Sequence, residues 1–206
     1  TEFTLALTLP AAIALIMIPA ALVSVLFERG AFTASDTTAT AMAVAVYGVG
    51  LPAFVLQKVL SPLYFAREDT RTPFRFAVHA MIVNAVIAVG LAPFIGFIAA
   101  AIGTTVAGWV MLYQLWRGAQ AMDGAAEIDD RLAYALPRIA VSALVMGVVL
   151  FFAQQLLGDA LRASGWRYLA LAALVLIGAA VYFGLILATR AMRVSDLRGA
   201  MRRGGA

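Results

Sequence analysis

Polar side chains within the long apolar runs of this chain are few, and their types limit the chemistry that they can perform. Lys58 stands about two turns before the end of an apolar helix that we expect to finish near residue 66. An ammonium group at that depth either extends to the lipid headgroups or faces a wet cavity, where it would meet an anionic substrate or a carboxylate. The sequence is compatible with both interpretations.

A second polar group lies on the next two spans. A break at 92–96 predicts a hairpin centred near residue 94 or 95, with Asn84 and the Thr104–Thr105 pair each about ten residues away. At a rise of about 1.5 Å per residue, antiparallel helices place these groups at similar depth, roughly 15 Å into the membrane. The amide and the hydroxyls then form either an interhelical hydrogen bond or, with an acid from elsewhere, an oxygen-lined site for a monovalent cation.

No combination of side chains is suited to catalysis. The chain has one His, no Cys and no pair of carboxylates within its apolar runs. Nucleophilic and metal-assisted hydrolysis need such groups in combination, so we expect a protein that is not an enzyme. We expect no organic cofactor; a coupling cation, sodium or a proton, or the membrane potential is the remaining candidate energy source.

The composition indicates a helical membrane protein. Apolar residues make up 64% of the 206-residue chain, charged residues only 13%, and the mean hydropathy is +0.95. Several charge-free stretches approach the roughly 20 residues that a helix needs to cross about 30 Å of hydrocarbon. They predict an all-α transmembrane bundle of six spans, at 3–27, 37–65, 74–93, 96–116, 137–158 and 167–189.

The distribution of basic residues predicts the topology. With six spans, twelve of the fifteen Lys and Arg residues fall on one side, and only Arg29, Arg162 and Arg167 fall on the other. This positive-inside bias predicts that both ends of the chain are cytoplasmic. The net charge of +4 therefore reflects topology and contact with anionic membrane lipids, and we expect no nucleic-acid partner.

Proline and glycine predict bends in the first two spans. Pro10 and Pro19 each remove a hydrogen bond from the first span and favour a kink, which allows either curved packing or a cavity-lining helix. Gly48, Gly50 and Pro52 predict a break near the middle of the second span. These three residues are the best hinge candidate in the chain.

Polar segments connect or follow the spans. Asp69 or Thr70 is expected to cap the third span, with Pro73 in its first turn. The segment 123–136 has apolar residues at every fourth position among acids, which predicts an amphipathic helix on the cytoplasmic face. We therefore divide the chain into a transmembrane bundle at 1–190 and a basic cytoplasmic tail at 191–206.

Several ordered motifs indicate a family. They include Phe27-Glu-Arg-Gly-Ala-Phe-Thr33, Tyr47-Gly-Val-Gly-Leu-Pro-Ala-Phe54, Lys58-Val-Leu-Ser-Pro62 and Arg138-Ile-Ala-Val-Ser-Ala-Leu-Val-Met-Gly147. The most specific is Tyr64-Phe-Ala-Arg-Glu-Asp-Thr-Arg-Thr-Pro73, which ends in Asp69, Thr70, Arg71, Thr72 and Pro73. Together they resemble the MurJ (MviN) family of lipid II flippases, within the MOP superfamily of flippases and exporters.

The resemblance implies a piece of a larger transporter. Family members have fourteen spans in two lobes, and this chain resembles the last six, so the N-terminal lobe and most of the headgroup-binding arginines would lie outside it. The last two spans, within 139–189, match the apolar groove that is thought to take the polyprenyl tail. Some members bind sodium in this lobe; Asn84 and Thr104 match two ligand positions, whereas Ala88 stands where an acidic ligand would be.

The resemblance also implies a function in cell-wall biogenesis. The parent protein would move lipid II, the lipid-linked peptidoglycan precursor, across the bacterial inner membrane by alternating access. Lys58 would add positive charge to the cavity crossed by the polar head, and bending would occur near Gly48–Pro52. One alternative is an exporter of small cations or polysaccharide lipids from the same superfamily. Another is a membrane scaffold that recruits cell-wall synthesis partners through 123–136 and 190–203.

Overall fold

The computed structural model describes residues 2–122, 130–163 and 165–189, and all regular structure within these ranges is helical. In chain order the helices are α1 (Glu2–Met17), α2 (Pro19–Phe27), α3 (Ala34–Phe65), α4 (Arg71–Ile95), α5 (Ile98–Gln120), α6 (Asp130–Leu156), α7 (Gly158–Arg162) and α8 (Arg167–Ala188). The predicted all-α fold class is confirmed.

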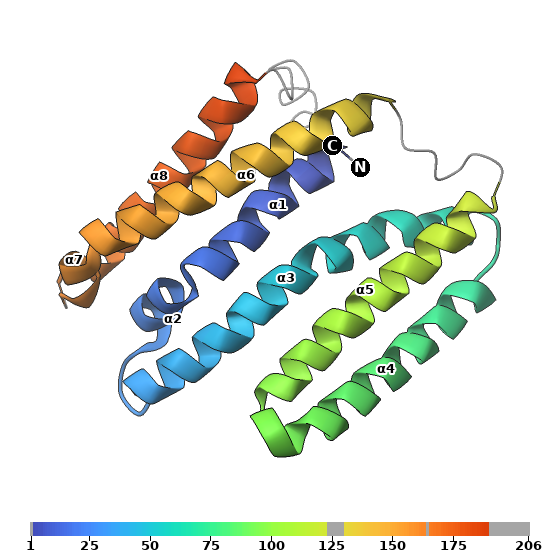
Figure 1. Cartoon of the computed structure of the whole chain (residues 1–206), viewed down its shortest axis with the longest axis horizontal. Helices are drawn as coiled ribbons and strands as arrows, with labels where there is room; N and C mark the ends of the chain where they lie inside the picture. Colours follow the sequence, from blue (N-terminus) through green and yellow to red (C-terminus); the bar gives the residue numbers. More distant parts are fainter. Residues whose placement is uncertain (1, 123–129, 164, 190–206) are drawn as a thin grey trace.

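The long helices form a layer in which each packs against its neighbours (Figure 1). Across this layer the order is α8, α6, α1, α3, α5 and α4, while the short helix α2 continues from α1 and packs on α3 and α8. The connections α2–α3, α4–α5 and α6–α8 lie at one end of the layer, and the α3–α4 connection lies at the other. Successive spans therefore run antiparallel, as the predicted topology requires.

The predicted six-span bundle is confirmed, with its first span broken. Helices α3, α4, α5, α6 and α8 are each long and apolar enough to cross a membrane, and α1 with α2 supplies a sixth span if the bent pair crosses as one. Many large apolar side chains are exposed on the outer sides of these helices. They include Phe74, Val86, Val89, Phe94, Leu156 and Leu176. Hydrocarbon is the solvent that accepts such a surface.

The predicted surface helix at 123–136 divides into two parts. Residues 123–129 lie outside the described residues, as does the predicted basic tail at 191–206. Residues 130–136 form the first turns of α6 and continue without interruption through Pro137 into the span. The structure thus joins 130–136 to the span as one helix, because a proline near the beginning of a helix does not need to end it when the following residues pack well. The location of 123–136 on the cytoplasmic face stays a prediction.

The first span bends at only one of its two prolines. Helix α1 continues through Pro10, whereas α1 and α2 meet at 79° immediately before Pro19. Proline at residue i leaves the carbonyl of residue i−4 without its helical donor, so Pro10 frees the carbonyl of Ala6. Tyr182 of α8 donates its hydroxyl hydrogen bond to that carbonyl, and both residues are buried. A neighbouring helix thus replaces the bond that proline removes.

The predicted break near Gly48, Gly50 and Pro52 is not present in this structure. Helix α3 runs uninterrupted from Ala34 to Phe65 and includes both Pro52 and Pro62. Gly48 lies against α1, where an added Cβ would be 3.1 Å from the Cβ of Leu15 and 3.2 Å from the carbonyl oxygen of Ala12. The glycines therefore allow close helix packing; their role as a hinge stays a prediction.

Candidate functional site

Lys58 lies on an exposed stripe of α3. Tyr47 and Phe65 share its side of the helix, since they are eleven and seven residues away, and they are 41% and 53% exposed. Lys58 is itself exposed. The structure thus places the predicted cavity cation on the open surface of the layer, between two aromatic side chains. This arrangement suits either a wet cavity shared with another part of a larger protein or contact with lipid headgroups.

Behind that stripe, α3 and α5 are joined by four side-chain hydrogen bonds to backbone carbonyls. Two run from α5 to α3, from Thr105 Oγ1 to Val46 O at 3.0 Å and from Trp109 Nε1 to Val49 O at 3.1 Å. Two run the other way, from Gln57 Nε2 to Gly108 O at 2.7 Å and from Tyr64 Oη to Leu115 O at 2.6 Å. In an apolar medium such bonds hold two helices in one register.

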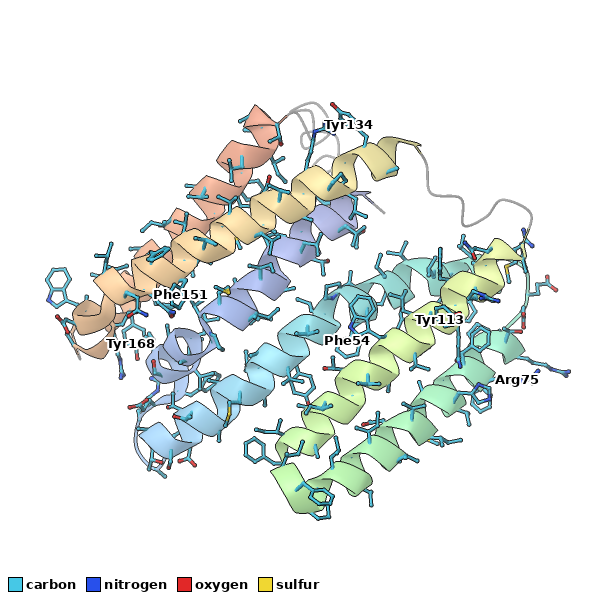
Figure 2. The ribbon with its side chains drawn as sticks, in the orientation of Figure 1. Phe54, Arg75, Tyr113, Tyr134, Phe151 and Tyr168 are labelled. Carbon is cyan, nitrogen blue, oxygen red and sulfur yellow. The ribbon has the colours of Figure 1, made fainter. Side chains whose placement is uncertain are left out.

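The ring of Phe54 fills the contact between the same two helices (Figure 2). Ring atoms of Phe54 would lie 2.8 Å from a Cβ on Gly50 and closer still to one on Gly108, so a larger residue at either position would require the ring to shift. The predicted hinge residue Gly50 is therefore part of the α3–α5 contact, and Gly48 faces α1 on the other side of α3. Helix α3 is the central element that supports Lys58.

The family motif forms the turn between α3 and α4. The Thr72 amide donates to Asp69 Oδ1 at 3.0 Å, so Asp69 caps α4 as predicted, and Pro73 lies in the first turn. The hydroxyl and backbone N–H of Thr72 hold the pKa of Asp69 below its usual range. Arg67 donates to the carbonyl of Met122 at 3.2 Å, which ties this turn to the end of α5. Thr70 and Arg71 are exposed.

Asn84 and Thr104 lie on the two helices of the α4–α5 contact, but they do not form a complete cation site. Asn84 lies against Gly103, and among the described residues its buried Oδ1 has no hydrogen-bond donor. Thr104 Oγ1 donates to Ala100 O within its own helix, at 2.8 Å. Ala88 also faces Gly103 and offers no side-chain ligand. A hard cation needs several oxygen ligands, so these residues do not fit a sodium ion, and we derive no transport step from one.

The last two spans carry an apolar surface and a hollow at their connected end. Phe152 is 61% exposed on α6 and Leu176 is 67% exposed on α8. A cavity of about 480 Å³ lies beside α7 and is lined mainly by alanine and leucine, with Asp159 and Trp166 also contributing. The surface is suited to hydrocarbon chains, and Figure 2 shows Phe151 and Tyr168 in this part of the layer.

The sequence did not reveal the residues that join the helices. Gln57, Trp109 and Tyr182 all donate to backbone carbonyls of another helix. A signal for Gln57 was present, because an amide one residue before Lys58 in an apolar run needs a partner. Tyr182 carried no such signal, since tyrosine is common in membrane spans and its acceptor lies 176 residues away.

Comparison with known proteins identifies a family for most of the chain. The family model described as "Lipid II flippase MurJ" matches residues 1–164. Two relatives carry the description "Probable lipid II flippase MurJ". The relative from Rhizobium meliloti is 37% identical over 98% of this chain and 38% of its own length. The relative from Rhizobium tropici is 39% identical over 88% of this chain and 34% of its own length.

A solved structure shares the fold. It is described as "Lipid II flippase MurJ, inward closed conformation", and it superposes with a TM-score of 0.72 and 24% identity over 92% of this chain and 37% of its own. The chain therefore spans little more than a third of the proteins that it matches. The sequence match and the shared layer of helices lead to one conclusion: the chain belongs to the MurJ family of lipid II flippases.

Proposed function

We propose that the longer protein of which this chain forms a part is a lipid II flippase, a transporter and not an enzyme. The observation that carries this proposal is the family match over residues 1–164, together with relatives described as lipid II flippases. The chain supplies about a third of such a protein, so the substrate and its path are properties of the whole. Two surfaces of this chain contribute to that function, namely the exposed face of α3 and the hairpin of α6 and α8.

The exposed face of α3 contributes positive charge to the path of the polar head. Lipid II carries a pyrophosphate, and an ammonium group that faces a cavity of low dielectric attracts such an anion strongly. Lys58 is exposed between Tyr47 and Phe65, so it is available to a substrate that passes across this face. Alternating access then requires that the lobe outside this chain cover and uncover the same face.

The hairpin of α6 and α8 contributes the surface for the polyprenyl tail. Its exposed apolar side chains, among them Phe152 and Leu176, keep a hydrocarbon chain in contact with an apolar surface while the head crosses. We place the protein in the bacterial inner membrane, with α1 starting and α8 ending on the cytoplasmic side. Support comes from the excess of Lys and Arg on the α3–α4 side of the layer.

The function is tested in cells depleted of the full-length parent. Lipid II is labelled, and the fraction accessible from the outer leaflet is measured. We expect the outer pool to collapse while lipid II accumulates on the inner side. An unchanged outer pool would refute the flippase proposal.

The role of Lys58 is tested in the same cells by complementation. Lys58→Met is expected to lower the outer pool strongly, whereas Lys58→Arg, which keeps the charge, is expected to restore most of it. Arg75→Met is the matched control, because Arg75 is an exposed cation on α4 at the same end of the layer. If cells with Lys58→Met have the same outer lipid II pool as cells with the Arg75→Met control, Lys58 is a headgroup anchor and its role in the cavity is refuted.

A further inference from the structure

The hydrogen bonds between helices divide the layer into two groups. Helices α3, α4 and α5 form the first group, which we name the α3–α5 unit. Its four carbonyl hydrogen bonds join the 46–64 part of α3 to the 105–115 part of α5, and Arg67 adds a fifth at the Met122 carbonyl. Helix α4 packs closely on α5 where Asn84 meets Gly103. These contacts make the three helices one body.

Helices α1, α2, α6, α7 and α8 form the second group, which we name the α1–α8 unit. Three donors from the α6–α8 hairpin reach carbonyls of α1 and α2: Tyr182 to Ala6, Gln154 to Met17 at 3.4 Å, and Arg167 to Glu28 at 3.4 Å. The acceptors lie near the beginning of α1, at the bend, and at the end of α2. The hairpin is therefore fixed to the bent span at three depths.

The contact between the two units has a different chemistry. Its main part is the α1–α3 seam, where Ala12, Leu15 and Ile16 of α1 meet Gly48 of α3, and α2 also packs on α3 beside this seam. Among the described residues, the side-chain hydrogen bond that links the units lies at the end of the layer where α2 connects to α3. It runs from Thr37 Oγ1 to Glu28 Oε2 at 2.7 Å. At Gly48 the neighbouring α1 atoms belong to apolar side chains and one backbone carbonyl, and such contacts impose less directional preference on the helices than side-chain hydrogen bonds do.

The buried clusters show the same division. One cluster centres on Ile18, Ile139, Leu174 and Ile186, and all of its members belong to the α1–α8 unit. The other centres on Tyr64 and Leu115, and its members belong to the α3–α5 unit, including its last buried neighbour, Met122, just after α5. Neither cluster includes side chains from both sides of the α1–α3 seam. The two buried clusters and the side-chain hydrogen bonds of the described residues thus divide the layer at the same position, although α1 and α2 also pack on α3.

From this coincidence we infer that the layer moves as two rigid units, which slide along the α1–α3 seam about the tie between Thr37 and Glu28. The Lys58 stripe belongs to one unit, and the apolar α6–α8 hairpin belongs to the other. Sliding therefore changes the position of the cationic face relative to the apolar surface, by helix shifts of about 1–2 Å or more. The inference rests on the proposed function only for the role of the movement in transport.

The movement is tested by distance measurements on the purified full-length parent in lipid vesicles, with and without lipid II. Spin labels on a cysteine-free background are placed at exposed sites at the same end of the layer. Phe65→Cys with Tyr134→Cys crosses the seam, Phe65→Cys with Phe74→Cys lies within the α3–α5 unit, and Tyr134→Cys with Leu187→Cys lies within the α1–α8 unit. For the first pair only, we expect either two populated distances in one sample or a shift of about 2–5 Å between the samples with and without lipid II.

A disulfide across the α1–α3 seam tests whether movement along the seam is needed for flipping. Leu15→Cys with Gly48→Cys joins positions whose Cβ atoms are 3.1 Å apart, so a shift of a few tenths of an ångström gives disulfide geometry. Oxidation is expected to lower flipping about tenfold or more, reversibly on reduction, because it blocks the shear. The matched control, Ile13→Cys with Gly147→Cys, joins α1 to α6 within one unit and is expected to leave flipping unchanged on oxidation.

The outcomes separate this inference from the proposed function. Equally narrow and unchanged distances for all three spin-label pairs would overturn the two-unit movement, even if the parent flips lipid II. If the distance across the seam changes but depletion of the parent leaves the outer lipid II pool unchanged, the two-unit movement is supported and the proposed substrate is refuted. Equal loss of flipping on oxidation of both disulfide pairs would also overturn the inference.

Discussion

The span made of α1 and α2 turns by 79° before Pro19, whereas α3 contains Pro52 and Pro62 and runs without a break from Ala34 to Phe65. Both spans lose helical hydrogen bonds to proline, so proline alone does not explain the difference. Helix α3 packs between α1 and α5, and four hydrogen bonds hold it to α5. The bent span instead receives donors at Ala6, Met17 and Glu28 from another hairpin.

The comparison shows that neighbouring helices decide what a proline does. A helix that is held on two sides stays straight, because bending would break contacts on both. In the bent span, Tyr182 replaces the bond lost at Pro10, where α1 stays straight, and Gln154 donates to the Met17 carbonyl beside the bend at Pro19. The same local signal therefore leads to two different structures.

The largest expected effect comes from separating α3 from α5. A valine at residue 108 would overlap the ring of Phe54, so Gly108→Val should push the helices apart and lower the free energy of unfolding by about 1–3 kcal/mol. The thermal midpoint of the full-length parent in detergent measures this. Gly90→Val is the matched control, because a Cβ there meets open space on α4. Equal midpoints for the two variants would refute the close-packed α3–α5 contact.

Removal of the Tyr182 hydroxyl tests how the bent span is supported. Tyr182→Phe should cost about 1 kcal/mol, because the buried carbonyl of Ala6 loses its donor. In a Pro10→Ala background the cost should fall, since an alanine amide can supply the bond that proline lacks. A double-mutant cycle on the thermal midpoint measures this coupling, with the exposed Tyr47→Phe as control. Strictly additive effects would contradict the replacement of the missing bond by Tyr182.

A smaller effect is expected at the cytoplasmic end of α3, where Asp69 caps the next helix. Asp69→Ala should lower the thermal midpoint at neutral pH. Hydrogen bonds from Thr72 depress the pKa of Asp69 in the folded state. The stabilisation that the Asp69 carboxylate provides is therefore complete above the unfolded-state pKa of about 3.9. It is lost as the pH falls through the lower pKa of the folded state.

A pH series measures this effect as the difference in midpoint between wild type and Asp69→Ala. The difference should shrink towards the acid end of the series. Asp69→Asn is the matched control, since its amide oxygen caps without titrating. A difference that stays constant down to the acid limit would show that the carboxylate does not act as the cap.

The smallest expected effect is at Pro52. Because α3 is already straight and braced, Pro52→Ala should change the free energy of unfolding by no more than about 0.5 kcal/mol. Spin-label distances between the two ends of α3 should also stay the same. A changed direction of α3 in this variant would instead support the predicted hinge at Gly48, Gly50 and Pro52.

The sequence determined the spans and their connections because these follow from local properties. Charge-free length predicted the helices, and Asp69 with Pro73 marked the beginning of α4. It could not show how the carbonyl freed by Pro10 is satisfied, because the donor to Ala6 lies on α8. The depth argument placed Asn84 opposite the right stretch of α5, where it lies against Gly103, but it could not show that Thr104 bonds within its own helix. Tertiary partners decide these points.

The hydrogen bond between Tyr182 and Ala6 also sets a time order for the assembly of the chain. Its two partners are 176 residues apart in sequence. At a synthesis rate of about 5–20 residues per second, the carbonyl that Pro10 frees must wait roughly 9–35 s before α8 is made. Until then the bent span needs a temporary partner, such as water or the insertion machinery. The α3–α5 unit lies entirely between these two residues, so it can assemble while the ribosome is still at work.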